Sequence, residues 1–143
     1  MLALAALLIA LPVPGGAWSE FADARLAYTL RLPTGWHATV SHGAAIITSV
    51  PVANRYANPE MVRLPRGGAY IRILDYGRIR GAVPPRPAQI ELGRKETHAC
   101  GYGEGYLLGF RDRGRVIQAF VKLGPRTGGR AALAVLNSLR GTK

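Results

Sequence analysis

The chain has 143 residues, enough for one domain that buries roughly two thirds of its unfolded surface. A hydrophobic content of 48% argues against a disordered chain. The 19 Lys and Arg outnumber the 8 Asp and Glu, which gives a net charge of +11. The functional interpretation of such an excess is an anionic partner, either membrane lipid, wall polymer or nucleic acid. Because most bases stand singly along the chain, the sequence favours a generally solvated basic surface over a dedicated anion site.

The N-terminus has the features of an export signal. Residues 2–11 are apolar and uncharged, and this run is too short for a membrane-spanning helix, which needs about 20 residues. Prolines and glycines break the run, and small residues precede Trp18, as signal peptidase requires. The sequence therefore predicts a signal peptide over residues 1–17, cleaved near Ala17, and a secreted or extracytoplasmic domain over residues 18–143. An uncleaved N-terminal helix is the alternative.

Three strands with short connections are predicted next. Residues 25–32 alternate between polar and apolar side chains, with Leu30 and Leu32 on the apolar face. A turn at residues 33–35 leads to a strand over residues 36–40, and a turn at His42 leads to another over residues 44–50. This order predicts a three-stranded antiparallel meander.

The middle of the chain is less regular. Residues 51–68 carry Asn, Pro and Gly without a sustained period, which predicts a long surface loop with a helical turn near Pro59. Residues 69–76 follow as a strand with Ile71 and Ile73 inward. The prolines of residues 84–87 indicate a stiff connector, and short strands are expected over residues 89–92 and 95–100.

The C-terminal third predicts a hairpin covered by a helix. Residues 104–111 and 115–123 alternate as strands around a tight turn at residues 112–114. Thr127 is the expected N-cap of an amphipathic helix, and Gly141 is its expected C-terminal glycine. The helix stripe comprises Ala132, Val135, Leu136 and Leu139. The predicted fold class is α+β: a single antiparallel sheet of about six strands with the C-terminal amphipathic helix packed on one face.

Catalytic and metal chemistry have little support in the sequence. The only cysteine, Cys100, excludes an intrachain disulfide and a cysteine-based zinc site, and a lone cysteine is typically a small buried residue. The histidine spacing matches no common ligand pattern. We therefore expect no catalytic residue, metal or cofactor. The alternative is an enzyme or metal-dependent site around His98 and Cys100, which requires both to meet an acid such as Glu96 in a concave pocket.

Arginines provide the candidate binding residues. The two places where they approach clusters give the candidate anion or partner-binding set: Arg78, Arg80, Arg111, Arg113 and Arg115. Tyrosines and phenylalanines interleave with the arginines, so a nucleic-acid-binding module is a further alternative. That alternative requires one continuous basic face.

Two segments resemble a known family, and a third resembles a group of small exported proteins. Residues 28–36, Tyr-Thr-Leu-Arg-Leu-Pro-Thr-Gly-Trp, are similar to the strand and "P-x-G-W" opening of PsbP-like (Mog/PsbP-like) domains, and residues 136–140 resemble the end of their C-terminal helix. Residues 64–71 resemble a segment of small exported proteins from high-GC Gram-positive and related bacteria. The resemblance implies an antiparallel sheet flanked by helices, without catalytic residues. Members of the family bind protein partners or serve as extrinsic subunits of membrane complexes.

These features together predict a non-catalytic exported binding or accessory protein at the bacterial cell envelope, whose ligand the sequence does not name. The expected partner is an anionic envelope component or a protein, and any membrane contact would be peripheral.

Overall fold

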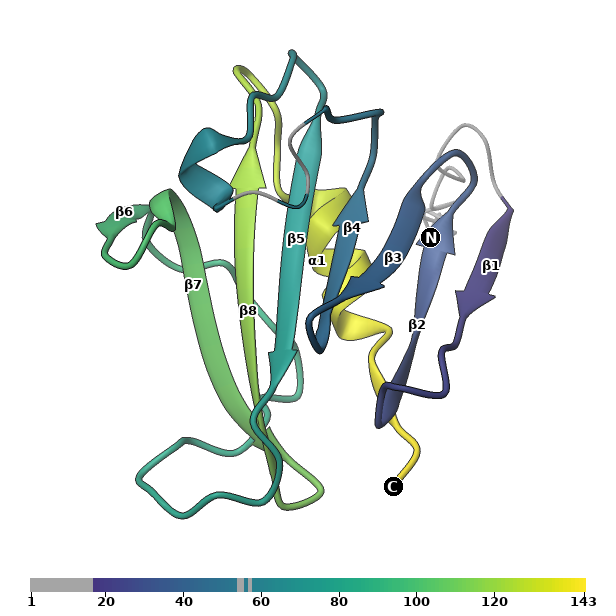
Figure 1. Cartoon of the computed structure of the whole chain (residues 1–143), viewed down its shortest axis with the longest axis vertical. Coiled ribbons are helices and arrows are strands. Elements are labelled where there is room, and N and C mark those ends of the chain that lie inside the picture. The colour runs from purple at the N-terminus through teal and green to yellow at the C-terminus, as the bar shows by residue number, and fades with distance from the viewer. Residues whose placement is uncertain (1–16, 54–55, 57) are drawn as a thin grey trace, which may run out of the picture.

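The computed structural model describes residues 17–53, 56 and 58–143, and shows two antiparallel sheets with one helix (Figure 1). The predicted signal peptide lies outside the described residues except for Ala17. The smaller sheet has the order β1-β2-β9. Its strands are β1 (Trp18–Phe21), β2 (Tyr28–Pro33) and β9 (Arg140–Gly141).

The larger sheet confirms the predicted antiparallel sheet of six strands, in the order β3-β4-β5-β8-β7-β6. Its strands are β3 (His37–Ser41), β4 (Ala44–Thr48), β5 (Ala69–Asp75), β6 (Glu96–His98), β7 (Gly103–Asp112) and β8 (Arg115–Leu123). The helix α1 (Arg130–Asn137) is C-terminal, as predicted. A short 3-10 helix, η1 (Pro59–Met61), forms at the expected place in the long loop.

The core lies between one face of the large sheet and a layer formed by α1 and β2. Figure 1 shows α1 behind β4 and β5. The apolar stripe of the helix is buried through Val135 and Leu136, and β2 contributes Leu30 to the same cluster. Ile71 and Ile73 of β5 face this core with no exposed surface, as the alternation predicts. The helix alone therefore does not cover this face of the large sheet, and β2 packs on the part that the helix leaves open.

The prediction of a single sheet that starts with a meander is wrong. β2 pairs with β1 and β9, while β3 pairs with β4 in the other sheet. The alternation of β2 correctly marks its buried face, including Leu30 and Leu32. Alternation identifies the face that meets the core, but it contains no information on the strand that lies alongside. Both edges of β2 are occupied by strands from the two ends of the described chain.

Both predicted helix caps are also wrong. The N-cap of α1 is Gly129, without a side-chain hydrogen bond. The Thr127 hydroxyl instead accepts a bond of 2.7 Å from the Gly67 N–H and donates one of 3.2 Å to the Pro125 carbonyl. The helix ends at Asn137, and Gly141 pairs with Tyr28 as part of β9. The chain thus becomes extended after Asn137, whereas the prediction required the helix to continue up to Gly141.

Residues 89–92 form no strand, contrary to the prediction. Ile90 is buried in the core, but its backbone N–H and C=O bond to the Asn137 side chain and not to another strand. Within the described part of the chain, no helix is long and apolar enough to cross a membrane.

Candidate functional site at the arginine end of the sheet

The structure brings all five predicted arginines to one end of the large sheet. Arg78 and Arg80 follow β5, while Arg111, Arg113 and Arg115 surround the turn between β7 and β8. Because Asp75 of β5 pairs with Ile117 of β8, the loop after β5 begins beside this hairpin turn. We define the arginine end as residues 75–86, 111–115 and 137–143, which hold eight Lys and Arg against two Asp.

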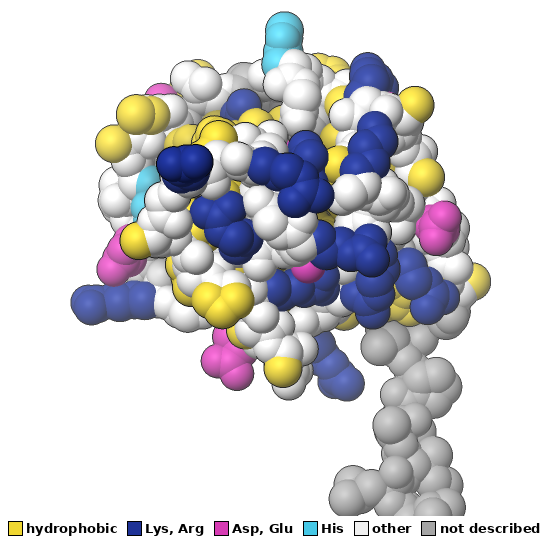
Figure 2. Space-filling model, turned by 90° about the horizontal axis from the view of Figure 1, so that it is seen from below, with side chains coloured by type: hydrophobic (Ala, Val, Ile, Leu, Met, Phe, Trp, Pro, Cys, Tyr) yellow, Lys and Arg dark blue, Asp and Glu magenta, His cyan; other side chains and the backbone are white. Residues whose placement is uncertain are grey.

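Figure 2 views the molecule from this end and shows Lys and Arg side chains gathered across the centre of the surface. The hairpin turn itself is tight, because Arg113 and Gly114 both have positive φ, at 50° and 81°. Such a turn matches the twist of antiparallel strands and projects the neighbouring side chains outward. The candidate site is therefore built on a short, well-defined connection.

Arg111 holds the loop after β5 against the hairpin. Its Nη1 donates to the Ile79 carbonyl at 2.9 Å and to the Gly114 carbonyl at 3.0 Å. Its Nη2 donates to the Gly81 carbonyl at 3.3 Å. A guanidinium that bonds three carbonyls from two segments has a structural role, and these bonds use most of its N–H donors.

Arg115 and Arg113 are also committed to the protein. Arg115 Nε lies 2.9 Å from Asp75 Oδ2 in a largely buried ion pair, and Asp75 Oδ1 accepts the Gly77 N–H at 2.7 Å. This pair sets the direction in which the loop leaves β5. Arg113 Nη1 donates to the Gly141 carbonyl at 2.8 Å and so fastens β9 to the hairpin.

Arg78 and Arg80 lie in the loop after β5 that Arg111 and Arg115 position, and both are exposed, as is Arg113. A Cβ added at Gly114 would collide with the Arg78 guanidinium, so that guanidinium lies directly over the hairpin turn. The five predicted residues thus divide into three whose guanidinium groups bond to the protein and two that the loop presents to solvent.

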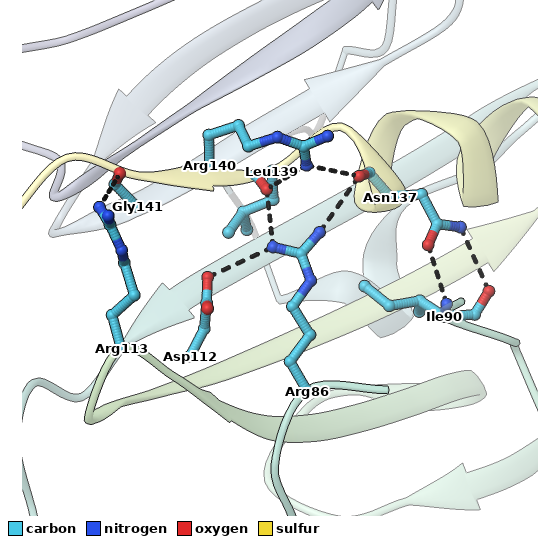
Figure 3. Close-up of polar contacts among 8 residues, drawn as sticks. All are labelled: Arg86, Ile90, Asp112, Arg113, Asn137, Leu139, Arg140 and Gly141. Atoms are coloured by element: carbon cyan, nitrogen blue, oxygen red, sulfur yellow. Dashed lines mark hydrogen bonds and ion pairs between the residues drawn. The ribbon is translucent and has the colours of Figure 1, made fainter. Parts of the chain in front are cut away.

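Sequence reasoning missed a second group of residues at this end, shown in Figure 3. Arg86 Nη1 lies 3.3 Å from Asp112 Oδ2 and donates to the Leu139 carbonyl at 2.7 Å, while Nη2 donates to the Asn137 carbonyl at 3.1 Å. Arg140 donates to the same two carbonyls. The Asn137 carbonyl lies at the end of α1, where carbonyls lack partners within the helix and carry partial negative charge, so arginines suit this place.

The signal that could have found Arg86 is weak. Arg86 is the one arginine inside the Pro84–Pro87 segment. In the structure this segment lies beside β7: Arg86 N donates to the Arg111 carbonyl at 2.9 Å, and Arg111 N donates to the Pro84 carbonyl at 2.7 Å. A proline-rich segment next to a strand is stiff and extended, which favours a fixed position for its side chains. Nothing in the sequence indicates that this position faces the helix terminus.

His98 and Cys100 lie near the opposite end, in β6 and the turn that follows. The His98 ring contacts Phe120 edge-on at 6.0 Å, and its Nε2 lies 3.3 Å from the Gly105 carbonyl oxygen. Cys100 is exposed, with a positive φ of 59°, so the expectation of a buried thiol is wrong. Glu96 is exposed on β6. Among the described residues, no group of three or more His, Cys, Asp or Glu could hold a metal ion.

A depression also lies at that opposite end, between the ends of β7 and β8 and residues 124–128, with a volume of about 740 Å³. Lys122, from its wall, donates from Nζ to the Pro59 carbonyl at 2.9 Å and to the Val62 carbonyl at 2.7 Å. Burial lowers the pKa of Lys122, and the nearby charge of Arg63 lowers it further. Lys95 pairs with Glu104 at 2.9 Å. The depression is thus lined by charged groups of both signs, and Arg126 is exposed among them.

No protein-family model matches this chain, and no curated protein matches it. A crystal structure of a protein from Bacteroides thetaiotaomicron VPI-5482 is similar, with 12% sequence identity and a TM-score of 0.43. The similarity covers 87% of this chain and 48% of that one, so this chain spans about half the length of its structural neighbour.

Proposed function

We propose that this protein is a non-catalytic binding or accessory protein of the bacterial cell envelope that recognises an anionic partner through Arg78 and Arg80. The observation that supports the proposal is the division of the arginines. Asp75, Asp112 and backbone carbonyls occupy most guanidinium groups at the arginine end, whereas Arg78 and Arg80 are exposed. Their loop is fixed before any ligand arrives, which lowers the entropic cost of binding.

The chemistry of the ligand follows from the guanidinium group. Arginine binds carboxylate or phosphate oxygens in bidentate geometry, and Arg78 and Arg80 are close enough in sequence to contact one anionic group or two successive ones. The surrounding excess of positive charge attracts such a partner over a distance that shrinks with salt. The signal-like residues 1–17 and the resemblance to PsbP-like domains support a location outside the cytoplasm.

The test uses vesicles that contain phosphatidylglycerol and, separately, immobilised glycerol-phosphate polymer. At low salt we expect the chain to bind at least one of them, and the Arg78→Gln/Arg80→Gln double variant to bind about tenfold more weakly. The matched control is Arg66→Gln/Arg94→Gln, which removes the same charge from exposed positions outside the arginine end. The control should bind like the unmodified chain.

Three results would contradict the proposal. The first is a lack of binding to both probes at low salt, and the second is an equal loss in the two double variants, which would reflect net charge alone. The third is tighter binding to duplex DNA than to either probe. Cell fractionation with N-terminal sequencing tests the location, because export predicts a mature chain that begins near Trp18 outside the cytoplasm.

A further inference from the structure

One edge of β7 is only partly occupied. β7 is ten residues long, whereas β6 pairs with it only from Gly103 to Gly105. At the other end, the Pro84–Arg86 segment bonds to the backbone of Arg111. Between these two contacts, no described residue pairs with this edge. Figure 1 shows the outer margin of β7 without a neighbouring ribbon from β6 down to the loop at the arginine end.

The alternation of the strand identifies the backbone groups that face this edge. Arg111 directs its N–H and C=O away from β8, to Arg86 and Pro84. Residues at even spacing from Arg111 face the same way, so Gly109 and Leu107 present their N–H and C=O groups at the open edge. Their neighbours Leu108 and Phe110 direct theirs toward β8.

The side-chain surface beside these groups is open as well. The Leu107 side chain is 38% exposed, and a Cβ added at Gly109 would have no atom within 4 Å. Gly109 lies opposite Gln118, whose Oε1 accepts a bond of 3.1 Å from the Tyr76 hydroxyl. The glycine therefore leaves a space between Leu107 and Tyr76 on the sheet face away from α1. An incoming strand could place a side chain in this space.

Natural proteins usually protect exposed strand edges, because unpaired backbone groups invite a further strand. Here the chain itself protects both ends of the β7 edge, with β6 and with the Pro84–Arg86 segment, and leaves the middle open. Added strands obtain affinity from main-chain hydrogen bonds and specificity from alternate side chains. The open part spans residues 106–110, which is about 17 Å at the usual rise of about 3.3 Å per residue.

We propose that this edge binds a short extended segment of a partner protein, which adds as a strand beside Leu107 and Gly109. A second copy of β7 is a poor occupant, because its continuing strand would collide with β6 at one end and with Pro84–Arg86 at the other. A segment of about five residues that turns away at both ends fits between them.

The charges at the two ends of the gap select the sequence of this segment. Arg80 and the rest of the arginine end lie beyond Arg111, whereas the exposed carboxylate of Glu96 and the Lys95–Glu104 ion pair lie beside Gly105. The segment that fits is therefore acidic where it approaches the arginine end. Its middle residues are β-branched or aromatic, since these suit a strand and can fill the space over Gly109.

The experiment selects seven-residue segments from a random display library on the full chain, after depletion on the Gly109→Pro variant. Proline removes the Gly109 N–H from the open edge and leaves the bonds of Leu108 and Phe110 to β8. A second variant, Leu107→Lys, places a charge at an exposed edge position, the device by which natural edges resist pairing. Circular dichroism and thermal unfolding check that both variants are folded.

We expect selected segments to carry an acidic end and β-branched residues, and to bind the unmodified chain at least tenfold more tightly than either variant. Amide exchange at Leu107 and Gly109 should slow when a segment binds, while exchange at Leu108 stays the same. Failure to enrich any segment, or equal binding to Gly109→Pro, would refute the proposal. Vesicle or polymer binding through Arg78 and Arg80 should survive Gly109→Pro, so the two proposals can fail separately.

Discussion

Each of the two ends of the large sheet uses a cationic side chain to hold a loop, but the ends differ in the charges that surround this side chain. At the upper end in Figure 1, Lys122 of β8 donates to the Pro59 and Val62 carbonyls and so holds the long loop. At the arginine end, Arg111 of β7 holds the loop after β5 through the Ile79 and Gly81 carbonyls. In both places, a charged side chain of a strand donates to backbone carbonyls of the adjacent loop.

The two ends differ in the other charged groups that surround these bonds. At the upper end, Lys95 pairs with Glu104, and Glu60 is close to Lys122, so positive and negative groups are interspersed. At the arginine end, two aspartates face eight bases, and Arg78 and Arg80 stay exposed. A count of arginines therefore says little about binding. The informative quantity is the number of guanidinium groups left after the backbone carbonyls and carboxylates of the protein have been satisfied.

The substitution with the largest expected effect is Arg86→Met, which tests whether the arginines of this end are structural. It would leave the Asp112 carboxylate without its ion-pair partner and would remove the bonds from Arg86 to the Asn137 and Leu139 carbonyls. Both partners of the ion pair are about four-fifths buried. We expect a loss of about 3 kcal/mol in the free energy of unfolding, measured by urea denaturation.

Arg140→Met is the matched control, because Arg140 donates to the same two carbonyls from an exposed position. Its loss should stay below about 1 kcal/mol, since Arg86 still satisfies these carbonyls and exposed interactions contribute little. Equal losses in the two variants would contradict the distinction between buried, structural arginines and exposed ones.

The equivalent substitution at the upper end is Lys122→Met, with an expected loss of about 2 kcal/mol from two charge-assisted hydrogen bonds to carbonyls. The loss is smaller than for Arg86→Met because no carboxylate is left unpaired, and because burial already disfavours the charged lysine. Amide exchange should show faster opening of residues 59–62. Lys95→Met, which breaks an exposed ion pair, should cost less than about 0.5 kcal/mol.

The sequence predicted local structure well and long-range pairing poorly. The strands around residues 69–75 and 103–123 follow from alternation, and the hairpin turn follows from Arg113 and Gly114, because these signals depend on neighbours along the chain. The smaller sheet was not predicted. β9 has only two residues, and its position beside β2 depends on Leu139 being buried and on Arg113 holding the Gly141 carbonyl.

The candidate site shows the same limit. Spacing along the chain identified Arg78, Arg80, Arg111, Arg113 and Arg115, and the fold places them at one end. Spacing could not separate the exposed pair from the three that bond to the protein, since that separation depends on carbonyls of Ile79, Gly81 and Gly141. Every residue has a backbone carbonyl, so the type of the acceptor residue does not indicate that its carbonyl accepts a hydrogen bond. The sequence therefore does not reveal such a bond.

The smallest effect on stability at neutral pH is expected from Tyr28→Phe. Tyr28 is buried near Asp75. The Tyr28 hydroxyl is buried without a hydrogen-bond partner among the described residues. Burial raises the pKa of Tyr28, and the negative charge of Asp75 raises it further. Because phenylalanine fills the same space without a hydroxyl to desolvate, we expect the stability at pH 7 to change by less than about 0.5 kcal/mol.

The variant should differ from the unmodified chain at alkaline pH. Below the ordinary tyrosine pKa of about 10, the phenol is neutral in both the folded and the unfolded state, so pH has no effect through this group. Above it, the unfolded chain releases the proton while folded Tyr28 retains it, and stability falls as pH rises toward the raised folded pKa. Urea denaturation at pH 9.5 and 11 should therefore show Tyr28→Phe losing about 1 kcal/mol less than the unmodified chain. An identical loss in both would mean that the Tyr28 hydroxyl reaches solvent, and that the arginine end is more open beneath Asp75 than the bond from Arg115 implies.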